Sequence, residues 1–169
     1  SEHKPWENAD AFAFHPYRRD AYELSNMATE VIPKWVNEFK KYGKDDIELW
    51  YTEAGYSLIE SAIGKEEIKA AFNTRKYLYL QGLDLVDLYS TYNFEQKGMY
   101  LKNREYMFGM VTPGIPLERD VYNGFFLATE SFVATTAMNY LMAQVEPAGD
   151  YSDGNLMAYK YKSNKFGKD

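Results

Sequence analysis

Three short segments of the sequence end in side chains that could do chemistry. They read HPY at 15–17, TEAGY at 52–56 and YSTYN at 89–93. Glu53 is the carboxylate among them, and a carboxylate that accepts a hydrogen bond from a neighbouring donor stays ionised and oriented for nucleophilic attack. His15 or Tyr17 could be that donor, and Ala54 and Gly55 would leave room for a ligand. The alternative is that Glu53 caps a loop or forms an ion pair, and that His15 is a satisfied histidine near the core.

Aromatic and amide side chains accompany this carboxylate. The chain has 16 tyrosines, 10 phenylalanines and 3 tryptophans, a composition that suits a surface stacking on a flat polar ligand such as a sugar. The alternative is that many of these rings fill the core, where aromatic side chains are also common. With Glu53 as the catalytic candidate, the predicted substrate-binding residues are His15, Tyr17, Tyr56, Tyr89, Tyr92 and Asn93.

Alternating strands and helices must position these side chains. β-branched and aromatic residues predict strands at 10–17, 47–53, 83–94 and 156–162. Apolar residues three and four apart, with glycines at the ends, predict helices at 24–39, 65–82 and 123–145. Pro33 should kink the first helix. Glycines and prolines predict an irregular loop at 95–121 and a turn cluster at 146–155.

The alternation of strand and helix predicts an α/β fold with parallel strands and right-handed crossovers. The carboxyl ends of parallel strands lie at one edge of the sheet, with neighbouring strands about 4.8 Å apart, so the three segments should converge there. Three such units are too few for a closed eight-stranded barrel, which takes about 250 residues. They would form a small open sheet or a piece of something larger.

Composition excludes several classes of protein. The formal net charge is −6 and lysine and arginine are not clustered, which argues against nucleic acid or an anionic membrane as the main partner. No apolar run is long enough to span a membrane. The chain has no cysteine and only two histidines, so thiol chemistry is excluded and a metal centre is not expected. We expect no cofactor.

The order of the motifs resembles the C-terminal half of clan A glycoside hydrolases, which are (β/α)8 barrels with two catalytic glutamates. The resemblance covers about residues 9–146, through DAFAFHPY, IELWYTEAGY, RKYLYLQGLDLVDLYSTYNF and ATTAMNYLMAQV. FHPY is similar to the sixth barrel strand, WYTEAGY to the seventh and LVDLYSTYNF to the eighth. The tail LMAYKYKSNKFGKD is similar to the first strand of the β-sandwich that often follows such barrels.

This resemblance implies that the chain is part of an enzyme cleaving a poly- or oligosaccharide. Glu53 matches the nucleophile of the seventh strand, and His15 and Tyr17 match positions that contact the nucleophile or the sugar. The implied mechanism is retaining hydrolysis, in which two carboxyl groups stand about 5–5.5 Å apart. Strands one to five, which carry the acid/base glutamate, have no counterpart here. Thr91 stands where the eighth strand often has tryptophan, so Tyr89 or Tyr92 would take that place.

The resemblance therefore predicts a three-unit segment of a (β/α)8 barrel with a short C-terminal strand. We expect residues 1–146 to belong to the barrel and residues 147–169 to form a linker and the first strand of a β appendage. The partner of the segment would be the N-terminal half of the same barrel or another copy of the chain. The enzyme would be secreted or periplasmic.

Glu60, Glu95 and Asp20 are the other carboxylates near the strand ends, and the family layout gives none of them the acid/base role. Two other readings stay open. The chain could be a non-catalytic carbohydrate-binding domain, or an unrelated small α/β protein in which Glu53 is structural. A glycine-rich phosphate loop would favour a nucleotide binder, and none follows a predicted strand.

Overall fold

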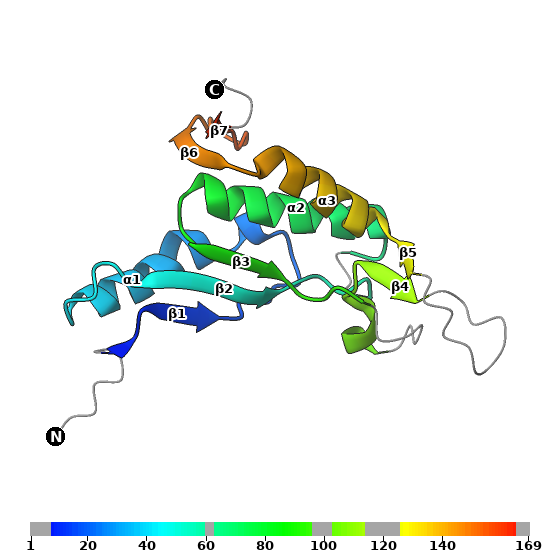
Figure 1. The fold of residues 1–169 in the computed structure, drawn as a ribbon, viewed down its shortest axis with the longest axis horizontal. Helices are drawn as coiled ribbons and strands as arrows, with labels where there is room; N and C mark the ends of the chain where they lie inside the picture. The colour runs from blue at the N-terminus through cyan, green and yellow to red at the C-terminus, as the bar shows by residue number, and fades with distance from the viewer. Residues whose placement is uncertain (1–7, 60–62, 96–102, 114–125, 165–169) are drawn as a thin grey trace.

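A three-stranded parallel sheet forms the centre of the fold. The computed structural model describes residues 8–59, 63–95, 103–113 and 126–164. The strands lie in the order β1 (Ala11–Phe14), β2 (Glu48–Ala54) and β3 (Leu88–Thr91), and both pairings are parallel, as the sequence predicted. Their carboxyl ends therefore point the same way (Figure 1).

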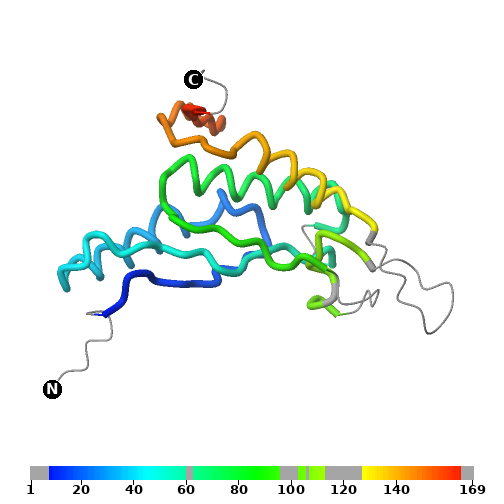
Figure 2. The backbone as a smooth tube through the Cα atoms, in the orientation of Figure 1, coloured from blue at the N-terminus to red at the C-terminus, as the bar shows by residue number. Residues whose placement is uncertain are grey.

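Helices connect the strands. Between β1 and β2 come a 3-10 turn, Tyr22–Leu24, a π-helical turn, Met27–Val31, and α1 (Ile32–Lys40). The predicted break at Pro33 therefore corresponds to the start of α1. Helix α2 (Glu66–Gly82) connects β2 to β3, and α3 (Glu130–Met142) packs alongside α2 on the side away from β3 (Figures 1 and 2).

The core lies between the sheet and the helices. Phe12 and Phe14 share one face of β1, and the ring of Trp35 in α1 contacts both, with ring centroids 5.5 and 5.1 Å apart. Tyr51 of β2 lies on the same face and is fully buried. On the opposite face, Trp50 and Leu88 are 37% and 40% exposed. One face of the sheet is therefore covered, and the other presents apolar side chains.

The buried face of α2 is unusually polar. Lys69, Asn73 and Lys76 are buried there, each 3% exposed or less. The Lys76 ammonium lies 4.7 Å from the ring centre of Tyr56 and 5.7 Å from that of Tyr51. Cation–π attraction partly replaces the hydration that such a buried ammonium loses.

Several predicted boundaries were wrong. The expected helix at 123–145 begins only at Glu130, because Thr129 caps it by accepting a hydrogen bond from the Phe132 amide. Ahead of the cap, β5 (Phe126–Ala128) pairs antiparallel with β4 (Val111–Pro113), which lies inside the expected loop at 95–121. That loop also contains a 3-10 turn, Arg104–Met107. Residues 96–102 and 114–125 lie outside the described part of the chain.

Strands β6 (Val145–Asp150) and β7 (Tyr159–Ser163) form a C-terminal hairpin. The expected last strand is therefore present, whereas its partner β6 occupies residues predicted as a turn cluster. The Tyr161 hydroxyl donates to the Leu78 carbonyl at 2.8 Å, which holds the hairpin against α2. The expected strand at 83–94 is shorter, because Asp84 adopts a positive φ of 52° after α2 and pairing begins at Leu88.

Buried tyrosines make the fold sensitive to alkali. Burial raises the pKa of Tyr22, Tyr51 and Tyr89 well above the ordinary value of 10.0. The unfolded chain therefore ionises first, and this contribution to stability is complete below pH 10 and is lost as pH rises above it. We expect the free energy of unfolding to fall by about 4 kcal/mol by pH 11, at about 1.4 kcal/mol for each tyrosine.

Urea unfolding at constant ionic strength between pH 7 and 11 measures this loss. A midpoint that stayed constant up to pH 11 would contradict the burial of these three hydroxyls.

Candidate functional site

The carboxyl ends of β1 and β2 bring His15 and Glu53 into contact. His15 Nδ1 lies 3.1 Å from Glu53 Oε2, and the other ring nitrogen, Nε2, lies 3.1 Å from Thr52 Oγ1. The side chains of His15 and Glu53 are 53% and 33% exposed, so the pair is open to a ligand. Because both imidazole nitrogens have partners, the ring is fixed in orientation beside the carboxylate.

An irregularity in β2 aims Glu53 at His15. Tyr51 pairs with Tyr89 and Ala54 pairs with Thr91, so β2 has one residue more than β3 between these two pairs. In a regular strand, successive side chains point to opposite faces. A bulge lets two successive residues share a face. Here Thr52 and Glu53 both reach His15, which sequence alternation alone does not predict.

Tyr17 provides a second partner for Glu53. Partial burial raises the pKa of the Tyr17 hydroxyl above its usual range, and the charge of Glu53 and a hydrogen bond with it raise that pKa further. The phenol is therefore protonated throughout the neutral range and donates to the carboxylate. The predicted partners of Glu53, His15 and Tyr17, thus both lie in the turn that directly follows β1.

Aromatic rings extend the site beyond Tyr17. The ring centroids of Tyr92 and Phe108 lie 6.1 and 5.6 Å from that of Tyr17, and they lie 5.5 Å from each other. The Arg104 guanidinium carbon lies 4.9 Å from the centre of the Phe108 ring and 5.9 Å from that of Tyr17. Sequence analysis missed Arg104 and Phe108, because they lie in a stretch read as irregular loop.

Asn93 and Gly55 have local roles at the ends of β3 and β2. Asn93 Oδ1 accepts a hydrogen bond from the Glu95 amide at 3.1 Å, and the peptide bond that precedes Asn93 is cis. A Cβ atom on Gly55 would overlap the carbonyl oxygen of Tyr92 and approach the Phe108 ring to 3.1 Å. The space expected for a ligand at Gly55 is therefore occupied by the backbone of Tyr92.

Two predicted binding residues lie away from Glu53. Tyr56 is 1% exposed; its hydroxyl donates to the Asp20 carbonyl at 3.0 Å, and its ring packs on Phe72 of α2. Tyr89 pairs with Tyr51 and follows it onto the helix-covered face, where its ring also contacts Tyr77. Both rings belong to the layer between the sheet and α2.

Other potential ligand groups are few. Of the remaining carboxylates near the strand ends, Glu95 forms a backbone bridge with Val111 and Glu60 lies outside the described residues. Within the described ranges, no three histidine, cysteine or acidic side chains are grouped closely enough to hold a metal ion. None of the helices in those ranges is both long and apolar enough to cross a membrane.

A solved structure shares this arrangement of strands and helices. It is a family 39 glycoside hydrolase from the gut symbiont Bacteroides cellulosilyticus WH2, with a TM-score of 0.69 and 17% sequence identity. The chain is similar in fold to a third of that enzyme. The superposition covers 94% of this chain and 32% of the enzyme. No family model matches the sequence, and no curated protein matches it.

At this level of identity the similarity shows the fold. The chain has an α/β fold that corresponds to a segment of a (β/α)8 barrel, as the sequence predicted. The chain spans about a third of the length of the enzyme.

Replacing Tyr17 with phenylalanine tests the contact between its hydroxyl and Glu53. A hydrogen bond to a charged group contributes about 1.5–3 kcal/mol, so we expect the free energy of unfolding of Tyr17→Phe to fall by about that amount. Because the phenol stays protonated well past neutral pH, urea unfolding should show the same loss at pH 7 and at pH 9. Tyr140→Phe, at a position 61% exposed on α3, is the control. An unfolding midpoint unchanged from the wild type in Tyr17→Phe would refute the contact.

Proposed function

We propose that the chain is part of a glycoside hydrolase in which Glu53 is the nucleophile of a retaining mechanism. The observation that carries this proposal is the contact between His15 and Glu53 at the carboxyl ends of two parallel strands. Enzymes built on barrels place their catalytic groups at these strand ends. The fold similarity to a family 39 glycoside hydrolase supports the same assignment.

Each partner of Glu53 has a role in this chemistry. A Glu53 oxygen forms a bond to the anomeric carbon, the glycosidic carbon–oxygen bond breaks, and the leaving oxygen takes a proton from a second carboxylic acid. Water then attacks the anomeric carbon and gives up a proton to that second group, while the bond between this carbon and Glu53 breaks and releases the carboxylate. His15 and Tyr17 hold the Glu53 carboxylate in place and disperse its charge before attack, so that it need not reorganise during the reaction.

The sugar would lie against the aromatic side chains beside Glu53. Tyr17 and Tyr92 extend from the carboxylate toward Phe108, and a sugar ring can stack on such faces. Arg104 and Asn93 add groups that can donate hydrogen bonds to hydroxyls. The ligand would therefore be a sugar whose ring stands over the end of β2.

The acid/base group would come from outside this chain. Among the described residues, the outer edges of β1 and β3 have no partner strand within the sheet, and Trp50 and Leu88 are exposed on its uncovered face. Unpaired edges and apolar faces favour association. We infer that the remaining strands of the barrel cover this face and bring the second carboxyl group to within about 5–5.5 Å of Glu53.

Covalent labelling tests the proposal directly. The full natural polypeptide should hydrolyse at least one member of a panel of aryl glycosides. A 2-deoxy-2-fluoro glycoside of that sugar should trap the glycosyl ester, and mass spectrometry of peptides should find the label on Glu53. The 169-residue chain alone should hydrolyse none of the panel. Sugar binding without turnover by the full polypeptide would instead indicate a non-catalytic carbohydrate-binding domain.

A further inference from the structure

The wall of the candidate site is carried by a segment that does not belong to the sheet. Residues 104–110 contain Phe108, which is 1% exposed and contacts the rings of both Tyr17 and Tyr92. Tyr17 in turn interacts with Glu53. The position of this segment therefore determines where the Tyr17 hydroxyl lies relative to the carboxylate.

A buried lysine holds this segment from behind. Lys69 of α2 is 0% exposed, and its ammonium donates to the carbonyl of Gly109, the residue after Phe108, at 2.6 Å. The same ammonium lies 3.2 Å from Glu66 Oε1. A short charge-assisted bond in a buried place fixes its acceptor more firmly than a bond between neutral groups does.

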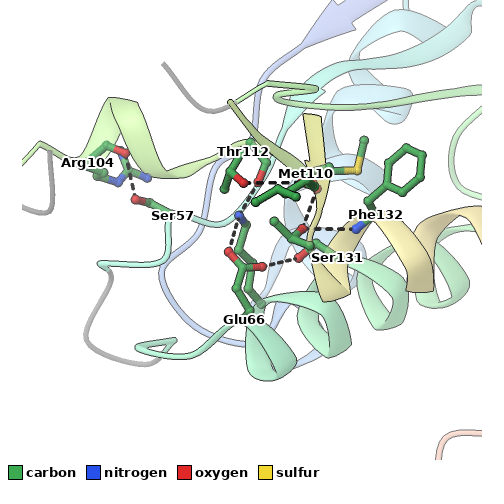
Figure 3. Close-up of polar contacts among 11 residues, drawn as sticks. Ser57, Glu66, Arg104, Met110, Thr112, Ser131 and Phe132 are labelled. Carbon is green, nitrogen blue, oxygen red and sulfur yellow. Dashed lines mark hydrogen bonds and ion pairs between the residues drawn. The ribbon is translucent and has the colours of Figure 1, made fainter. Parts of the chain in front are cut away.

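The acidic partner of Lys69 is itself held in place by α3. Glu66 Oε2 accepts a hydrogen bond from the Ser131 hydroxyl at 3.2 Å, and Ser131 is fully buried (Figure 3). Thr129, which caps the same helix, donates from its hydroxyl to the Met110 carbonyl at 2.5 Å. The starts of α2 and α3 thus meet behind the site wall and bind its backbone at two successive residues.

Ser57 adds a third contact at the other end of the segment. Its hydroxyl donates to the Arg104 carbonyl at 2.8 Å (Figure 3). Of these three side-chain donors, Lys69 alone carries a charge. Burial lowers the pKa of the Lys69 ammonium, whereas the charge of Glu66 and its hydrogen bond raise it. Glu66 therefore favours the charged form of Lys69 in this enclosed place.

From these contacts we propose that Lys69 is a positioning residue, which sets the place of Phe108 and, through Phe108, of the Tyr17 hydroxyl beside Glu53. The effect of this positioning on hydrolysis rests on the proposed function. Glu66 and Ser131 serve the same end by holding the ammonium where it can reach Gly109.

The test variant removes the ammonium without leaving a buried charge behind. In Lys69→Met/Glu66→Gln both members of the ion pair become neutral and keep nearly the same volume, so the fold avoids the penalty of an unpaired charge. Glu66→Gln alone shows how much of the effect comes from losing the carboxylate, because it keeps the Lys69 side chain. Lys65→Met, at a position whose side chain is 70% exposed, controls for loss of a lysine.

Nuclear magnetic resonance of the 169-residue chain provides a readout that does not depend on activity. In the double variant, the ring resonances of Phe108 and Tyr17 should shift, and the Met110 amide should exchange with solvent at least about tenfold faster. Lys65→Met should resemble the wild type, and Glu66→Gln, which leaves the ammonium without its carboxylate, should shift these resonances less than the double variant does. A folded double variant whose Phe108 and Tyr17 resonances are unmoved would overturn the inference.

If the double variant does not fold, the exchange rate of the Lys69 ammonium in the wild-type chain still tests the contact with Gly109. The ammonium protons of Lys69 should then appear as a slowly exchanging signal close to Gly109 and Phe108. A Lys69 ammonium that exchanges as fast as that of Lys65 would overturn the inference.

Kinetics of the full natural polypeptide separate positioning from general stability. Because a misplacement of about 1 Å can reduce turnover about 100-fold, kcat should fall by at least about tenfold in the double variant. KM should change by less than about threefold, since most sugar contacts remain. If Glu53→Gln leaves hydrolysis intact, the proposed function is wrong. The resonance shifts of Phe108 and Tyr17 would still test whether Lys69 positions these two rings.

Discussion

Replacing Glu53 with glutamine should reduce glycoside hydrolysis by the full natural polypeptide by at least about 1,000-fold, or about 4 kcal/mol of transition-state stabilisation. Glutamine has nearly the same shape as glutamate, so the fold and most of the sugar affinity should persist. Its amide cannot form the glycosyl ester on which the mechanism depends. Turnover of an aryl glycoside, with sugar affinity from calorimetry, measures both expectations.

Chemical rescue distinguishes a lost nucleophile from a damaged site. In Glu53→Ala, azide or formate can occupy the space left by the carboxylate and attack the anomeric carbon in its place. The recovered product should have the inverted anomeric configuration, because only one displacement then occurs. Glu38, in α1, has a side chain that is 53% exposed, and Glu38→Gln should leave turnover nearly unchanged. Wild-type turnover in Glu53→Gln would show that Glu53 is not the nucleophile and would favour a non-catalytic binding domain.

Gly55→Ala should destabilise the chain strongly. The added Cβ would overlap the Tyr92 carbonyl oxygen, which is backbone and cannot rotate away, and would crowd the Phe108 ring. Forced overpacking of this kind costs about 3 kcal/mol. For a chain of this size that loss corresponds to a Tm lower by about 6–12 °C. Thermal unfolding followed by circular dichroism measures the shift.

Gly43→Asn is the matched control for that experiment. Gly43 has a φ of +72°, a conformation that asparagine tolerates, and a Cβ there would meet nothing within 4 Å. Its Tm should change by less than about 4 °C, which corresponds to about 1 kcal/mol. If Gly55→Ala and Gly43→Asn unfolded at the same temperature, the close approach of β2 and Tyr92 would be disproved.

The parallel sheet and the meeting of His15, Tyr17 and Glu53 could be predicted from sequence, because strand–helix alternation fixes which strand ends share an edge. Which face of the sheet each individual side chain occupies could not be predicted. Tyr89 seemed available to a ligand, yet its pairing with Tyr51 turns it toward α2. Tyr56 follows the same strand tip as Glu53 and is nevertheless buried.

Other features escaped prediction because they depend on distant partners. Pro147 and Gly149 are typical of turns, yet they lie in β6 because β7 offers a pairing edge and the register shifts between them. The buried face of α2 could not be predicted, because it carries the polar residues Lys69, Asn73 and Lys76. Phe108 contacts Tyr17 from a segment whose backbone carbonyls accept hydrogen bonds from Ser57, Lys69 and Thr129, and no local pattern encodes those three contacts.

The bulge in β2 makes the candidate site depend on the number of residues between Tyr51 and Ala54. Thr52 and Glu53 share a face only because β2 has one residue more than β3 between the same two pairings. Deleting Thr52 would restore regular alternation, place Glu53 directly after Tyr51 and draw its carboxylate back along the strand by about 3.3 Å, and His15 would lose its contact with Thr52. In descendants of this sequence, single-residue insertions and deletions between Tyr51 and Ala54 should therefore be eliminated by selection.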